Sequence, residues 1–219
     1  GKLDGLDKSA RGAYKGAGIL GTSMSGAQLA IGAAAIGIGE AMAKISVSAT
    51  KMAIDVVESE NLVSVTFGDM TSDIVAWSDE IQQALGLNAF ELRKNAAMFY
   101  NIASSLGVTE KNAYKLAPGI SLLANDMASF YSLPTEEAFT KLRAGITGET
   151  EPLKQLGIVV DETTIKQTAY NLGLAKTGAE LTNNQKVLAR YLTILQQTGN
   201  AQGDLARTLD SPANQLRIF

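Results

Sequence analysis

The chain has 219 residues, with 19 Lys and Arg against 22 Asp and Glu, and it contains neither Cys nor His. These two absences exclude disulfides, zinc knuckles, thiol nucleophiles and any catalytic histidine. A formal net charge of -3 also argues against specific nucleic-acid binding, because a grip on duplex DNA depends on many Lys and Arg contacts to phosphate.

Aromatic residues are distributed unevenly along the chain. Eleven of the thirteen lie from Phe67 to Tyr191, and none lies between Tyr14 and Phe67. Because large rings supply much of the buried area of a globular core, we place the compact part downstream of residue 60. The predicted regions are an apolar Gly/Ala-rich helical segment at 1–60, a compact all-helical domain at 61–200, and the start of a further helix at 201–219. Both ends break off abruptly, so we expect a fragment of a longer chain.

The run from Gly16 to Gly39 carries no charge over 24 residues, and it consists of seven Gly, six Ala, seven larger aliphatic and four polar residues. A bilayer-spanning helix needs about 20 mostly apolar residues, so the length is adequate. Small residues four apart, such as Ala33 and Gly37, favour close helix packing. Three interpretations remain open: a helix that packs against copies of itself, a flexible stretch, and a segment that inserts into a membrane.

Downstream of residue 60 the apolar residues recur every three or four positions, which is the period of one helix face. Gly86 and Gly107 are stop signals, and Asn88 with Glu91 looks like a capping arrangement. The apolar series are Ile74, Trp77, Ile81 and Ala84; Leu92, Ala96, Phe99, Ala103 and Leu106; and Leu116, Ile120, Leu123, Met127 and Phe130.

Breaks and starts divide the rest of the chain. Pro118 and Gly119 interrupt the third series, so we expect a kink or a fresh start there. The run Ile158-Val159-Val160 is strand-like but too short to support a sheet. Further helices are predicted from Leu133-Pro134-Thr135, from Asp161 as the cap of Thr163 to Leu172, and from the capping box of Thr182 with Gln185 up to Gly199. The fold class is therefore all-α, with a Gly/Ala-rich apolar N-terminal helical segment followed by a compact multi-helix bundle.

Carboxylates, glycines and the single Trp were the remaining candidates for chemistry. Adjacent carboxylates on a helix point about 100° apart, so we interpret each pair as a helix N-terminal charge. Asp69, Asp73 and Glu149 lack the spacing of a metal site. Trp77 lies on an apolar series and is predicted to be a core residue. The carboxylate pairs are Asp79-Glu80, Glu136-Glu137 and Asp161-Glu162.

Two glycine-rich stretches resemble phosphate loops only in part. Gly16-Ala-Gly18 with Gly21 has the letters of a dinucleotide fingerprint but no preceding strand. The stretch from Ala144 to Leu153 lacks the Lys-Ser/Thr of a P-loop, and we predict a turn with a helix starting at Thr150. The sequence thus predicts no catalytic, cofactor-binding or metal-binding residue, no cofactor, and no enzyme.

Seven stretches between about residues 60 and 217 share their order and residue pattern with one family. The most specific is LRAGITGETEPLKQLG, from Leu142 to Gly157. The others are Val63 to Met70, Trp77-Ser78, Leu85 to Asn88, Leu92 to Phe99, Leu123 to Phe130, and Ala206 to Gln215. Together they resemble phage tail tape measure proteins, in particular those of phages of Gram-positive hosts. Pro212 departs from the pattern, because we expect a helix former there, and it puts the start of the terminal helix in doubt.

The resemblance implies a structural protein of the phage tail. Such a protein lies in the lumen of the tail tube, organises tube assembly, sets tail length, and leaves ahead of the genome. Its implied partners are the tail tube protein, the distal tail and tip proteins, tail assembly chaperones and several parallel copies of itself, such as a trimer. A host membrane is a further partner on ejection, which would bring the protein from the virion into the host cell envelope. The alternative is an envelope-penetrating or pore-forming protein that helps DNA cross the host membrane.

Overall fold

The computed structural model describes residues 56–218, and side chains as far as residue 215. This part of the chain is an all-helical bundle in which no strand occurs. The Gly/Ala-rich segment that we predicted at the N-terminus lies outside the described residues. The elements are a helix over 56–67, η1 (Gly68–Met70), α3 (Thr71–Leu85), α4 (Ala89–Ser105), α5 (Glu110–Phe130), α6 (Thr135–Thr147), α7 (Glu151–Lys154), α8 (Glu162–Asn171), α9 (Asn183–Gln197), α10 (Asp204–Arg207) and α11 (Pro212–Ile218).

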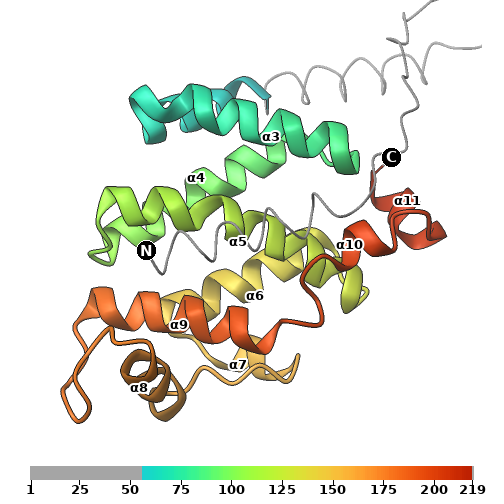
Figure 1. Ribbon diagram of the computed structural model, residues 1–219. Coiled ribbons are helices and arrows are strands. Elements are labelled where there is room, and N and C mark those ends of the chain that lie inside the picture. Colours follow the sequence, from blue (N-terminus) through green and yellow to red (C-terminus); the bar gives the residue numbers. More distant parts are fainter. Residues whose placement is uncertain (1–55, 219) are drawn as a thin grey trace, which may run out of the picture.

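The helices stack nearly in chain order, from α3 through α4 and α5 to α6, with α9 and α8 beyond them (Figure 1). At the near end, the helix over 56–67 crosses the predicted boundary at residue 60, and it buries Val63 and Phe67 in the core. At the far end, α10 returns to pack against α5. Helix α5 therefore lies in the middle of the stack of helices.

The ends of α3 and α4 follow the predicted signals. Gly86 ends α3 in the left-handed conformation, at φ 71°, which only glycine adopts at little cost. The Asn88 side chain then accepts hydrogen bonds from the backbone N–H groups of Phe90 and Glu91, so it caps α4 as predicted. Along α3, Ile74 and Ile81 are buried, whereas Trp77 is partly buried and packs against the core from its edge.

Helix α5 differs from the prediction at its proline. We expected a kink or a fresh start at Pro118 and Gly119, but a single helix runs from Glu110 to Phe130 and includes both residues. Burial explains the continuity, because eight consecutive residues shortly after the proline, from Ser121 to Ala128, are buried. Gly119 has a packing role: a Cβ there would stand 2.9 Å from the Tyr191 hydroxyl.

The link between α7 and α8 is extended but forms no sheet. The predicted strand-like run Ile158-Val159-Val160 buries Ile158 and Val160 and exposes Val159. The Gln197 side chain donates to the Val159 carbonyl oxygen at 2.6 Å and accepts from its N–H at 2.8 Å. The Gln197 side chain thus makes the two backbone hydrogen bonds to Val159 that a neighbouring strand would make. Asp161 then caps α8, and Thr182 with Gln185 forms the predicted capping box of α9.

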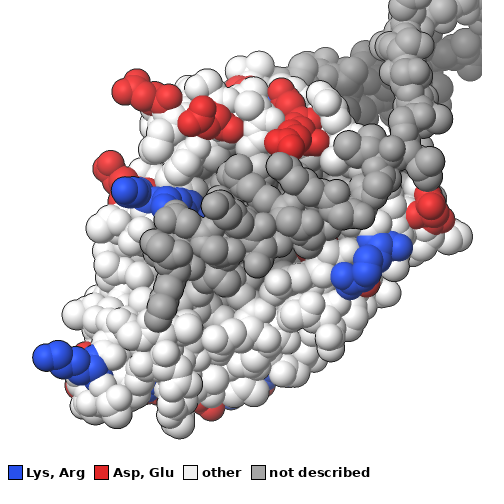
Figure 2. Space-filling view, viewed as in Figure 1, with Lys and Arg blue, Asp and Glu red and all other residues white. Residues whose placement is uncertain are grey.

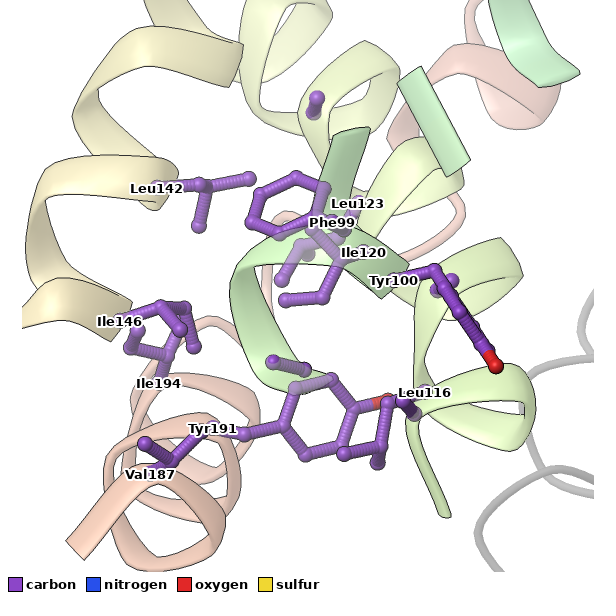
Figure 3. Packing of buried hydrophobic residues seen from close by; sticks show 14 of the residues in the cluster. Phe99, Tyr100, Leu116, Ile120, Leu123, Leu142, Ile146, Val187, Tyr191 and Ile194 are labelled. Atoms are coloured by element: carbon purple, nitrogen blue, oxygen red, sulfur yellow. The ribbon is translucent and has the colours of Figure 1, made fainter. Parts of the chain in front are cut away.

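Most buried side chains belong to one continuous cluster, which we call the main core (Figure 3). It joins Phe99 of α4, Ile120 of α5, Leu142 of α6 and Ile194 of α9. Aromatic rings meet edge to face within it, as in the Phe99–Phe139 pair with ring centres 4.8 Å apart. A smaller cluster, which we call the side core, consists of Ile81, Leu85, Leu87, Leu92, Leu122 and Leu205.

Gly145 of α6 is a position of close approach between α6 and α7. A Cβ there would overlap the Leu153 side chain, with the Cγ only 2.9 Å away, and Leu153 is fully buried. We therefore predict that Gly145→Ala destabilises the bundle by about 1–3 kcal/mol, the usual cost of overpacking. Gly199→Ala is the matched control, since Gly199 is exposed and a Cβ there would meet nothing closer than the Gln196 carbonyl oxygen at 4.0 Å. Urea unfolding of both variants measures the difference, and equal midpoints would contradict the packing described here.

Candidate functional site

The three carboxylate pairs lie apart on different helices. Glu136 and Glu137 stand in the first turn of α6, and Glu162 follows the cap Asp161 in the first turn of α8, as predicted. Our interpretation of Asp79-Glu80 was wrong, because the pair lies beyond the middle of α3. Its position is explained by a partner instead of a helix dipole: Asp79 accepts a hydrogen bond from Arg93 at 3.2 Å.

No group of three or more acidic residues within 56–218 is arranged to hold a metal ion. Asp69 lies in η1, Asp73 lies in the first turn of α3, and Glu149 follows α6. The glycine motif at 16–21 lies outside the described residues. Within the described range, no helix combines the length and apolar character that crossing a bilayer requires.

The stretch that most specifically carries the family resemblance forms a tight corner between α6 and α7. Gly148 ends α6 with φ 111°, and Thr150 precedes α7, where Pro152 stands in the first turn as predicted. Arg190 reaches over this corner from α9 and donates to the Ile146 carbonyl oxygen at 3.3 Å. Burial lowers the pKa of the Arg190 guanidinium. The corner is thus formed by the turn at Gly148 and is held by the contact with Arg190.

A second feature is an arginine that joins three helices. Arg93 of α4 is 5% exposed, and its guanidinium bonds Glu60 at 2.6 Å and the Ser78 hydroxyl at 3.0 Å. It also lies over the Phe90 ring, 4.5 Å from the centre. A buried cation of this kind is tolerated only with several acceptors around it. Arg93 therefore links the helix over 56–67 to α3 and α4.

A third feature, which the sequence analysis missed, is a polar cluster at the C-terminal half of α5. Asp126 is 3% exposed, and its carboxylate accepts the backbone N–H of Gly203 at 2.8 Å and of Leu205 at 3.3 Å. The signal available in the sequence was Asn125-Asp126, two polar residues between the buried Leu123 and Met127. Two adjacent polar residues within a series of apolar ones indicate that their side chains have hydrogen-bond partners elsewhere in the fold.

Ser129 extends this cluster one turn further along α5. Its hydroxyl donates to the Asp204 carboxylate at 2.6 Å, and it accepts from the Asn214 amide at 2.9 Å. The same amide donates to the Thr208 hydroxyl at 2.8 Å. Residues from α5, α10 and α11 are therefore joined by one polar network, and its members bond to one another.

Surface charge does not gather into a basic face in the view of Figure 2. Lys and Arg side chains lie singly and apart, and acidic side chains lie over α3. Several of the exposed charges are paired, as Lys166 is with Glu180 at 2.9 Å and with Glu162 at 3.8 Å. Hydrogen bonding to Glu180 raises the pKa of the Lys166 ammonium and lowers that of Glu180.

No protein-family model, curated protein or solved structure matches this chain. Its function is therefore inferred from its own sequence pattern and from the contacts of its described residues.

The cap of α8 gives a pH-dependent prediction. Hydrogen bonds from the Thr164 backbone N–H and hydroxyl, both 2.8 Å, hold the pKa of Asp161 below its usual value. The stabilisation is present above the ordinary Asp pKa and is lost as pH falls through the lowered value. Thr164→Val removes only the hydroxyl donor, so we expect the Asp161 pKa to return part of the way upward. NMR titration of the carboxyl carbon measures both values. A wild-type pKa equal to that of Asp in an unfolded peptide would contradict the capping geometry.

Proposed function

We propose that this chain is part of a phage tail tape measure protein, a structural protein that sets tail length and organises assembly of the tail tube. The observation that carries the proposal is the series of seven stretches, in one order along most of the described chain, that resemble this family. The proposal includes the lumen of the tail tube as its location, and departure ahead of the genome during infection.

Contacts between these stretches support a scaffold role. Ser78 of one stretch bonds Arg93 of another at 3.0 Å, and Ser129 bonds Asn214 at 2.9 Å. Within the most specific stretch, from Leu142 to Gly157, Gly145 of α6 packs against Leu153 of α7. Residues that carry the resemblance thus hold helices together. We infer a non-enzymatic protein whose partners are the tube, the tail tip, assembly chaperones and further copies of the chain.

Tail length provides the direct test. An α-helix rises about 1.5 Å per residue, so an in-frame deletion of 100 helical residues elsewhere in the full gene is expected to shorten the tail by about 150 Å. A duplication of the same segment is the matched control and is expected to lengthen the tail equally. Electron microscopy of purified virions measures both. Unchanged tail length in both mutants would reject the ruler function.

A second candidate function, penetration of the host envelope, is favoured by the uncharged run from Gly16 to Gly39. The run lies outside the described residues, so the proposal depends on composition alone. We expect the whole chain to release dye from liposomes. Because a charge is costly inside a bilayer, a variant with Ile31→Asp and Ile36→Asp is the control and is expected to lose the leakage. Equal leakage from both proteins, or none from either, would refute membrane insertion by this segment.

A further inference from the structure

We propose that residues 203–215, comprising α10 and the first part of α11, form a latch that detaches from α5 as a unit while the rest of the bundle stays folded. The inference concerns the fold and holds whether or not the chain belongs to a phage tail. It depends on how the latch is attached, on what connects it to the bundle, and on what lies beneath it.

The latch is attached mainly by polar contacts. Among its residues, all of which the structure describes, Leu205 is the buried apolar side chain. The partly buried Ala206 also packs against the side core, and the hydrogen bonds of Asp126 and Ser129 tie the latch to α5. When a hydrogen bond opens to solvent, water replaces most of its energy, whereas lost apolar burial is not replaced. The latch therefore gains much less from attachment than α4 or α6, which contribute many side chains to the main core.

Bonds within the latch keep it together when it leaves α5. The Thr208 hydroxyl donates to the Asp204 carbonyl oxygen at 2.7 Å, and the Asn214 amide donates to the Thr208 carbonyl oxygen at 3.2 Å. Gln215 likewise donates to the Leu209 carbonyl oxygen at 2.8 Å. None of these bonds involves α5, so they need not break on detachment.

The connection to the bundle contains a natural pivot. Ala201 is 1% exposed in the main core, and Gln202 donates to the Leu195 carbonyl oxygen of α9 at 2.6 Å. Directly after these anchors, Gly203 has φ 74° and stands at the N-cap of α10. Three hydrogen bonds cross this point: the Asp204 N–H donates to the Ala201 carbonyl oxygen at 2.9 Å, and the exposed Arg207 side chain donates to the carbonyl oxygens of Asn200 and Gln202. Anchored residues on one side of a glycine and a self-bonded unit on the other are typical of a hinge.

Detachment would uncover the side core. Leu205 contributes to that cluster from the latch, and Ile81, Leu92 and Leu122 contribute from α3, α4 and α5. Leu122 is 6% exposed in the attached state, and Leu116, also on α5 but in the main core, is 7% exposed. Opening of the latch thus changes access to Leu122 and leaves Leu116 covered, which gives a matched pair of probe positions.

Thiol labelling tests the latch cleanly, because the chain has no Cys of its own. In the whole 219-residue chain, a Leu122→Cys variant is expected to react with a thiol reagent at least ten times faster than a Leu116→Cys variant in native buffer. Adding Ser129→Ala, which removes the hydrogen bonds of this hydroxyl to Asp204, Thr208 and Asn214, is expected to speed labelling further at position 122 only. Asp210→Asn, an exposed change in the same segment, is the control and is expected to alter neither rate.

Two results would overturn the proposal. One is labelling of both positions at the same rate with the same urea dependence, which would make the latch part of the global unfolding unit. The other is equal acceleration at both positions by Ser129→Ala. Hydrogen exchange in the wild-type chain gives an independent measurement without any substitution: the amides of Gly203 and Leu205, which bond Asp126, should exchange at least ten times faster than those of Leu122 and Leu123 and with little urea dependence.

Discussion

The constraint on which the rest of this structure depends is the burial of every residue of α5 from Ile120 to Ala128. A buried helix satisfies its own backbone groups, but each polar side chain on it must still find a hydrogen-bond partner. Ser121 bonds the Leu92 carbonyl oxygen of α4 at 2.9 Å, and Asp126 bonds the backbone at the start of α10. The polar side chains of α5 therefore help to determine which elements cover it and where they lie along it.

Arg93 and Asp126 are buried side chains of opposite charge, and both need partners that compensate for the loss of water. Each is a charged residue on a largely buried surface, and each is surrounded by groups of complementary polarity from elements distant in sequence. Removing one member of such an arrangement costs more than the arrangement contributes net, because the remaining charge is left buried. Arg93 holds the helix over 56–67 through Glu60, and Asp126 holds the segment that begins at Gly203.

Local signals in the sequence predicted most of the described helices. Asn88, Asp161, the Thr182–Gln185 box and the glycine stops act within a few residues, so their effect can be read without knowing the fold. The errors arose where a distant partner decides the outcome. Asp79 is placed by Arg93, Pro118 is carried within a helix by the burial that follows it, and the cluster of Asp126 joins residues 77 positions apart. Pro212, which put the last helix in doubt, stands at its first position, where its missing N–H has no cost.

The nearly sequential stacking of the helices has a mechanical consequence. When successive helices pack on their neighbours in the chain, tension applied between residues 56 and 218 pulls them apart one after another. The attachment of α10 to α5 is different, because it closes a loop of about 77 residues and lies directly in the path of such a force. It would be the first part of the described fold to carry load from the C-terminal side. Once it yields, α5 to α9 are still joined by their apolar contacts, so the chain can lengthen at this end while the main core stays intact.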